Sequence, residues 1–310
     1  MKILIELPTW LGDCVMATPA IENIVNSYND VEITFIGSFV SIEAMKNHPK
    51  AVKTVVLDKK YGVLYKTAKN LGEFDAFFSF RSSVRSKFLK FSISAKNKYQ
   101  FDKNKYRNCH QVKKYNDFVN DSLNTNLKPG VLKLYKNSKF KTQNSKLPLL
   151  GINPGASYGS AKRWYPQEFA KVAEELSSQY DIVIFGGPGE KDIAMDIEQS
   201  LIEKGVDNYQ NLAGNTTIPE LINHISKLDL FITGDSGPMH VAAAFQVPTV
   251  AIFGPTKDDE TSQWMNEKSI IVKKNLDCQP CMKRTCPLQH HDCMNLIKAA
   301  DVLSAVKAFN

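Results

Sequence analysis

The chain has 310 residues and a mass of 34.8 kDa, about twice the usual length of one domain, which favours two domains. Its 43% hydrophobic and 23% charged residues can bury a sizeable core, which excludes a predominantly disordered chain. The net charge of +7 is uneven, since residues 1–146 carry 25 basic and 12 acidic side chains and residues 147–310 carry 14 and 20. No apolar run reaches the roughly 18 residues that a spanning helix needs, and Glu6 interrupts the first one, so we expect a cytosolic chain without a secretory signal.

The first half alternates strand and helix patterns. Strands are predicted at 2–7, 31–37, 52–57 and 74–80, with a turn at Gly12-Asp13 and a helix over 15–27. A polar, Lys- and Asn-rich stretch at 133–148 is the best linker candidate, and we place the domain boundary between residues 146 and 147.

The alternation begins again after this stretch. Strands are predicted at 149–153, 181–185, 228–233 and 249–253, and helices at 166–179, 191–204 and 239–245. This order is typical of α/β domains with parallel sheets. Ligands of such sheets bind beyond the carboxyl ends of the strands, so the loops that follow the strands are the places to look for chemistry.

Asp13 follows the first predicted strand. It suits either a helix N-cap or a general base that takes a proton from an attacking hydroxyl, and composition alone leaves both open.

Three loops of the second half have the composition of anion sites. The loop 153–164 combines glycines and serines with Lys162, and the absence of a Gly-Lys-Ser/Thr core argues against an ATP-hydrolysing P-loop. Ser236 and Gly237 open a predicted helix, and Thr256 lies in a similar loop after the next strand; two such loops on neighbouring strands suggest a diphosphate. Glu190 is either a ribose ligand or a solvated first-turn residue.

Two further features stand apart from these loops. Cys278, Cys281, Cys286 and Cys293 have the ligand type of a structural zinc or iron site, although their irregular spacing also fits reduced thiols or adventitious disulfides. The stretch 81–114 holds eleven basic residues and one acidic residue, with aromatic residues interleaved. It suits nucleic acid, an anionic membrane surface or a negatively charged substrate, or is simply a solvated basic face.

Four motifs, in this order along the chain, resemble those of the ADP-heptose:lipopolysaccharide heptosyltransferases of glycosyltransferase family 9. They are Leu11-Gly12-Asp13, the loop from Pro154-Gly155-Ala156 to Lys162-Arg163-Trp164, Asp235-Ser236-Gly237-Pro238-Met239-His240, and Phe253-Gly254-Pro255-Thr256. The cysteine-rich tail makes the chain look most like the heptosyltransferase II branch of that family.

The resemblance implies a GT-B fold: two Rossmann-like domains, residues 1–146 for the acceptor and residues 147–310 for ADP-heptose, with parallel sheets facing a central cleft. It implies an inverting transferase without an obligatory metal, with Asp13 as the base and Lys162 neutralising charge on the diphosphate. The implied donor residues are Ser157, Lys162, Glu190, Ala213, Gly214, Asp235, Ser236, Gly237, His240 and Thr256, and the implied or guessed acceptor residues are Gly12, Arg81, Arg85 and Lys87.

The expected acceptor is the first heptose of the Kdo-lipid A inner core, reached at the inner face of the cytoplasmic membrane without a spanning helix. The alternatives are a heptosyltransferase I that acts on Kdo-lipid A itself, a GT-B transferase for another ADP-sugar, and, from a different class, a nucleic-acid-binding protein that uses residues 81–114. We expect no nucleic-acid partner.

Overall fold

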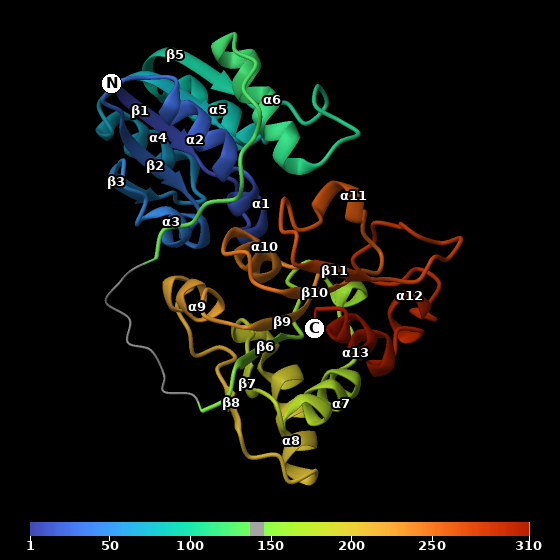
Figure 1. Ribbon diagram of the computed structural model, residues 1–310. Coiled ribbons are helices and arrows are strands. Elements are labelled where there is room, and N and C mark those ends of the chain that lie inside the picture. Colours follow the sequence, from blue (N-terminus) through green and yellow to red (C-terminus); the bar gives the residue numbers. More distant parts are fainter. Residues whose placement is uncertain (137–145, 310) are drawn as a thin grey trace. The chain divides into compact units, whose positions relative to one another are not determined.

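The computed structural model describes residues 1–136 and 146–309, and the chain divides into two compact units, Met1–Asn137 and Ser138–Asn310 (Figure 1). Most of the predicted linker, together with the approach to the predicted boundary at 146/147, lies outside the described residues. Each unit is an α/β layer structure with one parallel sheet, as the sequence predicted.

The sheet of the N-terminal unit has the strand order β3-β2-β1-β4-β5, and all its pairs are parallel. Its strands are β1 (Lys2–Glu6), β2 (Glu32–Gly37), β3 (Ala51–Val56), β4 (Glu73–Ser79) and β5 (Ser94–Gln100). The central strand β1 is buried on both faces, which is why it reads as a continuous apolar run. The polar strand β5 lies at the sheet edge, and its composition gave no strand signal.

Six helices accompany this sheet: α1 (Leu11–Met16), α2 (Thr18–Asn26), α3 (Phe39–Met45), α4 (Tyr61–Asn70), α5 (Val84–Ser92) and α6 (Gln111–Leu123). The prediction of a turn at Gly12-Asp13 followed by one helix over 15–27 was wrong, because the first helix begins one turn earlier and ends at Met16. Pro19 lies in the first turn of α2, where its missing N–H costs nothing, so the chain starts a new helix there.

The sheet of the C-terminal unit has the order β11-β10-β9-β6-β7-β8, again all parallel. Its strands are β6 (Leu149–Asn153), β7 (Asp181–Ile184), β8 (Tyr209–Asn211), β9 (Leu230–Gly234), β10 (Thr249–Ile252) and β11 (Ser269–Val272). Its helices are α7 (Pro166–Leu176), α8 (Lys191–Glu203), α9 (Ile218–Ile225), α10 (Gly237–Ala244), α11 (Asp258–Thr261), α12 (Asp292–Asn295) and α13 (Ala299–Lys307), with 3₁₀ turns at Ser160–Lys162 and Pro188–Glu190.

Each unit has its own apolar core. One cluster of buried side chains in the N-terminal unit joins β1, β2 and β4 to α4 and α5, and a larger cluster joins β6, β7, β9 and β10 to α7, α8 and α13. No helix in the described part of the chain is both long and apolar enough to cross a membrane.

Candidate active site

The loops that follow β6, β9 and β10 bring three predicted donor residues of the C-terminal unit together. Lys162 Nζ lies 2.5 Å from Asp235 Oδ2, and the Thr256 hydroxyl donates to the same carboxylate oxygen at 2.6 Å. Asp235 and Thr256 are 5% and 7% exposed, and the side chain of Lys162 is 12% exposed. Since β6, β9 and β10 are adjacent strands, their carboxyl ends place these residues at one sheet edge. The result is a mostly buried cation held in place by a buried carboxylate.

Asn153, the last residue of β6, links the loops that follow β6 and β9. Its side-chain amide donates to Gly155 O, to Thr233 Oγ1 and to Ser236 Oγ, each at 3.3 Å. Asn153 is 3% exposed, so it fixes the loops from inside the unit. Asn153 lies in the segment 153–164 but was not predicted as a site residue, and a polar residue that ends a buried strand is the signal that would have found it.

Ser236 and Gly237 begin α10, as the sequence predicted, and Ser236 occupies the N-cap position without a side-chain cap. The first N–H groups of a helix have no partner within the helix, which makes this end favourable for an anion. His240 lies on the second turn of α10 and is 2% exposed. Ser157, in contrast, is an exposed residue of the loop after β6.

Glu190 is buried, so the interpretation of it as a solvated first-turn residue was wrong. It is 9% exposed, accepts a hydrogen bond from Gly187 N at 2.7 Å, and packs so close to Gly155 that a side chain there would overlap its carboxylate. Ala213 and Gly214 adjoin the same loop, because Gly214 N donates to Gly186 O at 2.8 Å. The loops after β6 and β7 therefore meet around this carboxylate, and the loop after β8 joins them at Gly186.

In the N-terminal unit, Asp13 lies in the first turn of α1 and is partly exposed. The N-cap interpretation of Asp13 was wrong, because the N-cap of this helix is Trp10. Burial raises the pKa of the Tyr115 hydroxyl well above its usual value, and the nearby charge of Asp13 raises it further while that of Arg81 lowers it. Asp13 and Arg81 thus both lie within electrostatic reach of Tyr115.

Arg81 is anchored by a buried acid at the end of β1. Its Nη1 lies 3.5 Å from Glu6 Oε1, and Glu6 also accepts from Ser79 Oγ at 2.6 Å and Ser86 Oγ at 3.0 Å. Burial raises the pKa of the Glu6 carboxyl, and these hydroxyls and Arg81 oppose that rise. In the sequence, Glu6 marks only the interruption of the first apolar run, and a lone acid in such a run gave no signal for a site residue.

The other two predicted acceptor residues lie on α5. Arg85 donates through Nη2 to the carbonyl oxygen of Asp58, and Lys87 is exposed. Asp13 and Arg81 thus share an electrostatic neighbour in Tyr115, and Arg85 lies, like Arg81, within electrostatic reach of Glu6.

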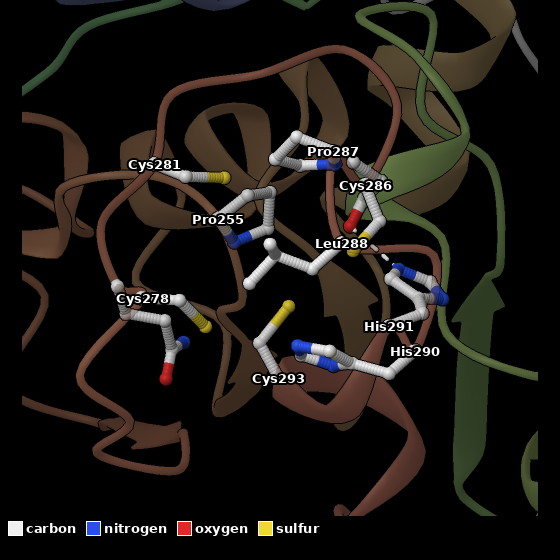
Figure 2. A pocket seen from close by; sticks show the side chains of 11 residues that line it. Pro255, Cys278, Cys281, Cys286, Pro287, Leu288, His290, His291 and Cys293 are labelled. Atoms are coloured by element: carbon white, nitrogen blue, oxygen red, sulfur yellow. Dashed lines mark hydrogen bonds between the residues drawn. The ribbon is translucent and has the colours of Figure 1, made fainter.

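The four tail cysteines line one cavity of about 20 Å³, together with His290 and His291 (Figure 2). Burial raises the pKa of the Cys293 thiol to about 11, and the charges of the other three thiols add to the rise. None of the six cysteines of the chain forms a disulfide. However, within residues 1–136 and 146–309 no group of three or more His, Cys, Asp or Glu side chains is arranged to hold a metal ion.

The cysteine-rich loop supports the predicted donor loops. Met282 N donates to Pro255 O at 2.9 Å, Ala161 N donates to Arg284 O at 3.0 Å, and Gln279 Nε2 donates to Gly254 O at 2.7 Å. Both ring nitrogens of His291 are within hydrogen-bond distance of a neighbour, Tyr165 Oη or Ala161 O. The imidazole of His291 is therefore engaged, which leaves the thiols as the stronger candidates for metal ligands.

Comparison with known proteins identifies the family. Residues 72–291 match the family model of glycosyltransferase family 9 (heptosyltransferase). The chain is 45% identical to lipooligosaccharide heptosyltransferase 2 of Campylobacter jejuni serotype O:2 over 99% of its own length and 98% of that protein. The chain belongs to glycosyltransferase family 9.

The solved structures of this family share the fold. The E. coli ADP-heptose lipopolysaccharide heptosyltransferase II superimposes with a TM-score of 0.83 at 21% identity, covering 99% of this chain and 98% of that chain. An E. coli heptosyltransferase with ADP gives 0.74 at 13% identity, with full coverage of both chains. The predicted GT-B fold and the resemblance to heptosyltransferases are confirmed, and this family 9 member is a heptosyltransferase of lipooligosaccharide core synthesis.

Proposed function

We propose that the protein transfers heptose from ADP-heptose, with inversion, to the first heptose of the Kdo-lipid A inner core. The observation that carries the proposal is full-length similarity to lipooligosaccharide heptosyltransferase 2 at 45% identity, with Lys162, Asp235 and Thr256 gathered at one sheet edge. In this reaction the acceptor oxygen bonds to the anomeric carbon, the bond from that carbon to the diphosphate oxygen breaks, and ADP leaves with its electron pair.

The C-terminal unit is proposed to bind the donor. Lys162 and the N–H groups at Ser236 and Gly237 stabilise the negative charge that grows on the leaving diphosphate. Asp235 orients Lys162, and Thr256 fixes Asp235 in turn. The remaining proposed donor contacts are Ser157 and His240 beside the diphosphate, Glu190 at the ribose, and Ala213 and Gly214 beside the adenine.

The N-terminal unit, which contains Gly12 and Asp13, is proposed to bind the acceptor. Asp13 takes the proton of the attacking hydroxyl. Arg81, held by Glu6, is suited to the phosphate and carboxylate groups of the inner core, and Arg85 and Lys87 are weaker candidates for the same contact. Since this acceptor carries a lipid, we place the protein in the cytoplasm at the inner face of the membrane, without a nucleic-acid partner.

We also propose that Cys278, Cys281, Cys286 and Cys293 hold a structural zinc or iron ion. The support is a set of four soft ligands around one cavity of about 20 Å³, enough for a single small ion. Because no ligand set is arranged in the described residues, the loop would have to close on the ion. Stoichiometric metal in freshly purified, reduced protein, lost in Cys278→Ser, supports this; protein free of zinc and iron refutes it.

The function is tested by mass spectrometry of the acceptor after incubation with ADP-heptose. We expect one heptose on heptosyl-Kdo-lipid A and none on Kdo-lipid A. Addition only to Kdo-lipid A would reassign the protein to the heptosyltransferase I reaction, and transfer only from another ADP-sugar would reassign the donor.

Asp13→Asn should lower kcat by about 10²- to 10⁴-fold while ADP affinity stays within about twofold, and near-normal turnover would remove Asp13 as the base.

A further inference from the structure

Helices α4 and α5 of the N-terminal unit leave several apolar and aromatic side chains exposed. Val84, Phe88 and Phe91 are spaced to lie along one side of α5, and Val84 and Phe91 are 76% and 85% exposed. The ring of Tyr61, which begins α4, meets that of Phe88 edge-on at 5.1 Å, and Tyr65 follows one turn later. We call these five residues the α4–α5 face.

Other residues of the same two helices form the contacts with the core. Leu64 and Ala68 of α4 and Leu89 of α5 are buried in one cluster with the sheet. Arg85 ties α5 to the segment before α4 by donating to the carbonyl oxygen of Asp58. Both helices thus bury one side. Phe88 also packs against this cluster, at the border of the α4–α5 face, whereas Val84 and Phe91 are largely exposed.

Basic side chains dominate the two helices, although the acidic residues Asp58 and Glu73 flank α4. The helices and the residues beside them, 59–72 and 81–92, contain eight basic side chains and no acidic one: Lys59, Lys60, Lys66, Lys69, Arg81, Arg85, Lys87 and Lys90. The ammonium group of Lys69 lies 5.5 Å from the centre of the Tyr65 ring. Cations interleaved with tyrosine and apolar side chains are typical of a surface that lies at the boundary between anionic headgroups and lipid tails.

We propose that the α4–α5 face docks the protein on an anionic lipid surface. RNA fits the same charge less well, because the most exposed members of the face include Val84, which has no aromatic ring for a base to stack on. A lipid interface accepts valine, phenylalanine and tyrosine alike. The proposal rests on the proposed function in one respect, namely that the acceptor is embedded in a membrane.

The test is flotation of the full chain with vesicles of phosphatidylglycerol and phosphatidylcholine, compared with phosphatidylcholine alone. We expect binding to the anionic vesicles only, weakened by salt, and about tenfold weaker for the double variant Val84→Ser/Phe91→Ser. Met195→Ser/Ile202→Ser is the matched control, since these residues are also seven apart on one helix, are 59% and 54% exposed, and lie on α8, which has four acidic residues and one basic residue. This control should bind as the unaltered protein does.

Activity separates this inference from the proposed function. With a lipid-free heptosyl-Kdo acceptor in solution, Val84→Ser/Phe91→Ser should turn over normally; with the acceptor in anionic vesicles it should lose about tenfold in kcat/KM. The docking proposal would be wrong if the double variant floated with anionic vesicles as the unaltered protein does. It would also be wrong if the protein bound single-stranded RNA more tightly than anionic vesicles. Neither result would contradict the proposed transferase activity. No heptose transfer to the soluble acceptor would count against the transferase instead.

Discussion

Lys162 and Asp235 are 73 positions apart, yet they form a mostly buried ion pair whose carboxylate is also bound by Thr256. Burying two charges costs solvation free energy, and their attraction offsets that cost only when both are present. A lysine in a loop is usually solvated; the ion pair with Asp235 gives Lys162 a fixed position. Donor phosphate would therefore meet a cation whose geometry is already set.

Replacing Lys162 with methionine should leave Asp235 buried without its ion-pair partner. We expect a loss of about 3–5 kcal/mol in the free energy of unfolding and at least tenfold weaker ADP binding, measured by chemical denaturation and calorimetry. Lys171→Met is the control, because Lys171 is 60% exposed and its pair with Glu168 is worth about 0–1 kcal/mol. Equal losses in both variants would show that Lys162 is an ordinary surface lysine.

Glu22 makes the N-terminal unit sensitive to acid. Burial alone would raise its pKa, but hydrogen bonds with His48, Lys133 and Tyr135 outweigh burial and lower the pKa from 4.5 to about 2. A lowered carboxyl pKa stabilises the folded state above pH 4.5, and this contribution is lost as the pH falls toward 2. Glu22→Gln should therefore lower the melting temperature at pH 7. The difference in melting temperature between this variant and the unaltered protein should shrink as the pH falls to about 2. A gap that does not change with pH would contradict the assignment.

At the scale of elements, the proposed donor loops are held by contacts with buried residues and with a neighbouring loop. Asn153 and Glu190 support the loop after β6 from within the unit, and the cysteine-rich loop supports it through Ala161. Loops fixed in this way need no large rearrangement to present N–H groups to a phosphate. The glycine at 155 is required because the Glu190 carboxylate occupies the space of a side chain.

Gly155→Ala should accordingly force the Glu190 carboxylate aside and shift the loop. We expect a clear loss of stability, of about 1–3 kcal/mol, and weaker ADP binding, checked by thermal denaturation and calorimetry. Gly189→Ala is matched to it, since Gly189 lies next to Glu190 and a methyl group there meets nothing within 4 Å. Should Gly155→Ala bind ADP as well as Gly189→Ala does, the loop is not constrained by Glu190.

At the scale of the molecule, the two units have separate sheets and separate apolar clusters. The cluster of the C-terminal unit runs from β6 to α13 and uses no residue of the N-terminal unit. All proposed donor residues also lie in the C-terminal unit. Folding and donor binding of this unit should therefore not require the other one.

Residues 147–310 produced alone should unfold in one cooperative transition and bind ADP within about tenfold of the full chain, as measured by circular dichroism and calorimetry. Heptose transfer should be absent, because Asp13 is missing. An unfolded fragment would show that the boundary is misplaced or that the units depend on each other.

The sequence by itself determined the α/β class, the strand-ending loops and the family. Buried parallel strands such as β6 and β9 read as apolar runs, and the loops that carry Lys162 and Asp235 follow these two strands, so local pattern was enough. The sequence pattern did not predict three features that depend on the surroundings of the residues. These are the polar edge strand β5, the early start of α1 and the burial of Glu190.

Only the tertiary structure decided which residues meet. Lys162 pairs with Asp235 across 73 residues, and Glu6 anchors Arg81 across 75. The four thiols, which lie within 15 residues of one another in the sequence, line one cavity. Parallel strands bring distant loops to one edge, but the order of the strands in the sheet, not their order in the chain, selects the neighbours. That order depends on the packing of the whole unit, which no local pattern records.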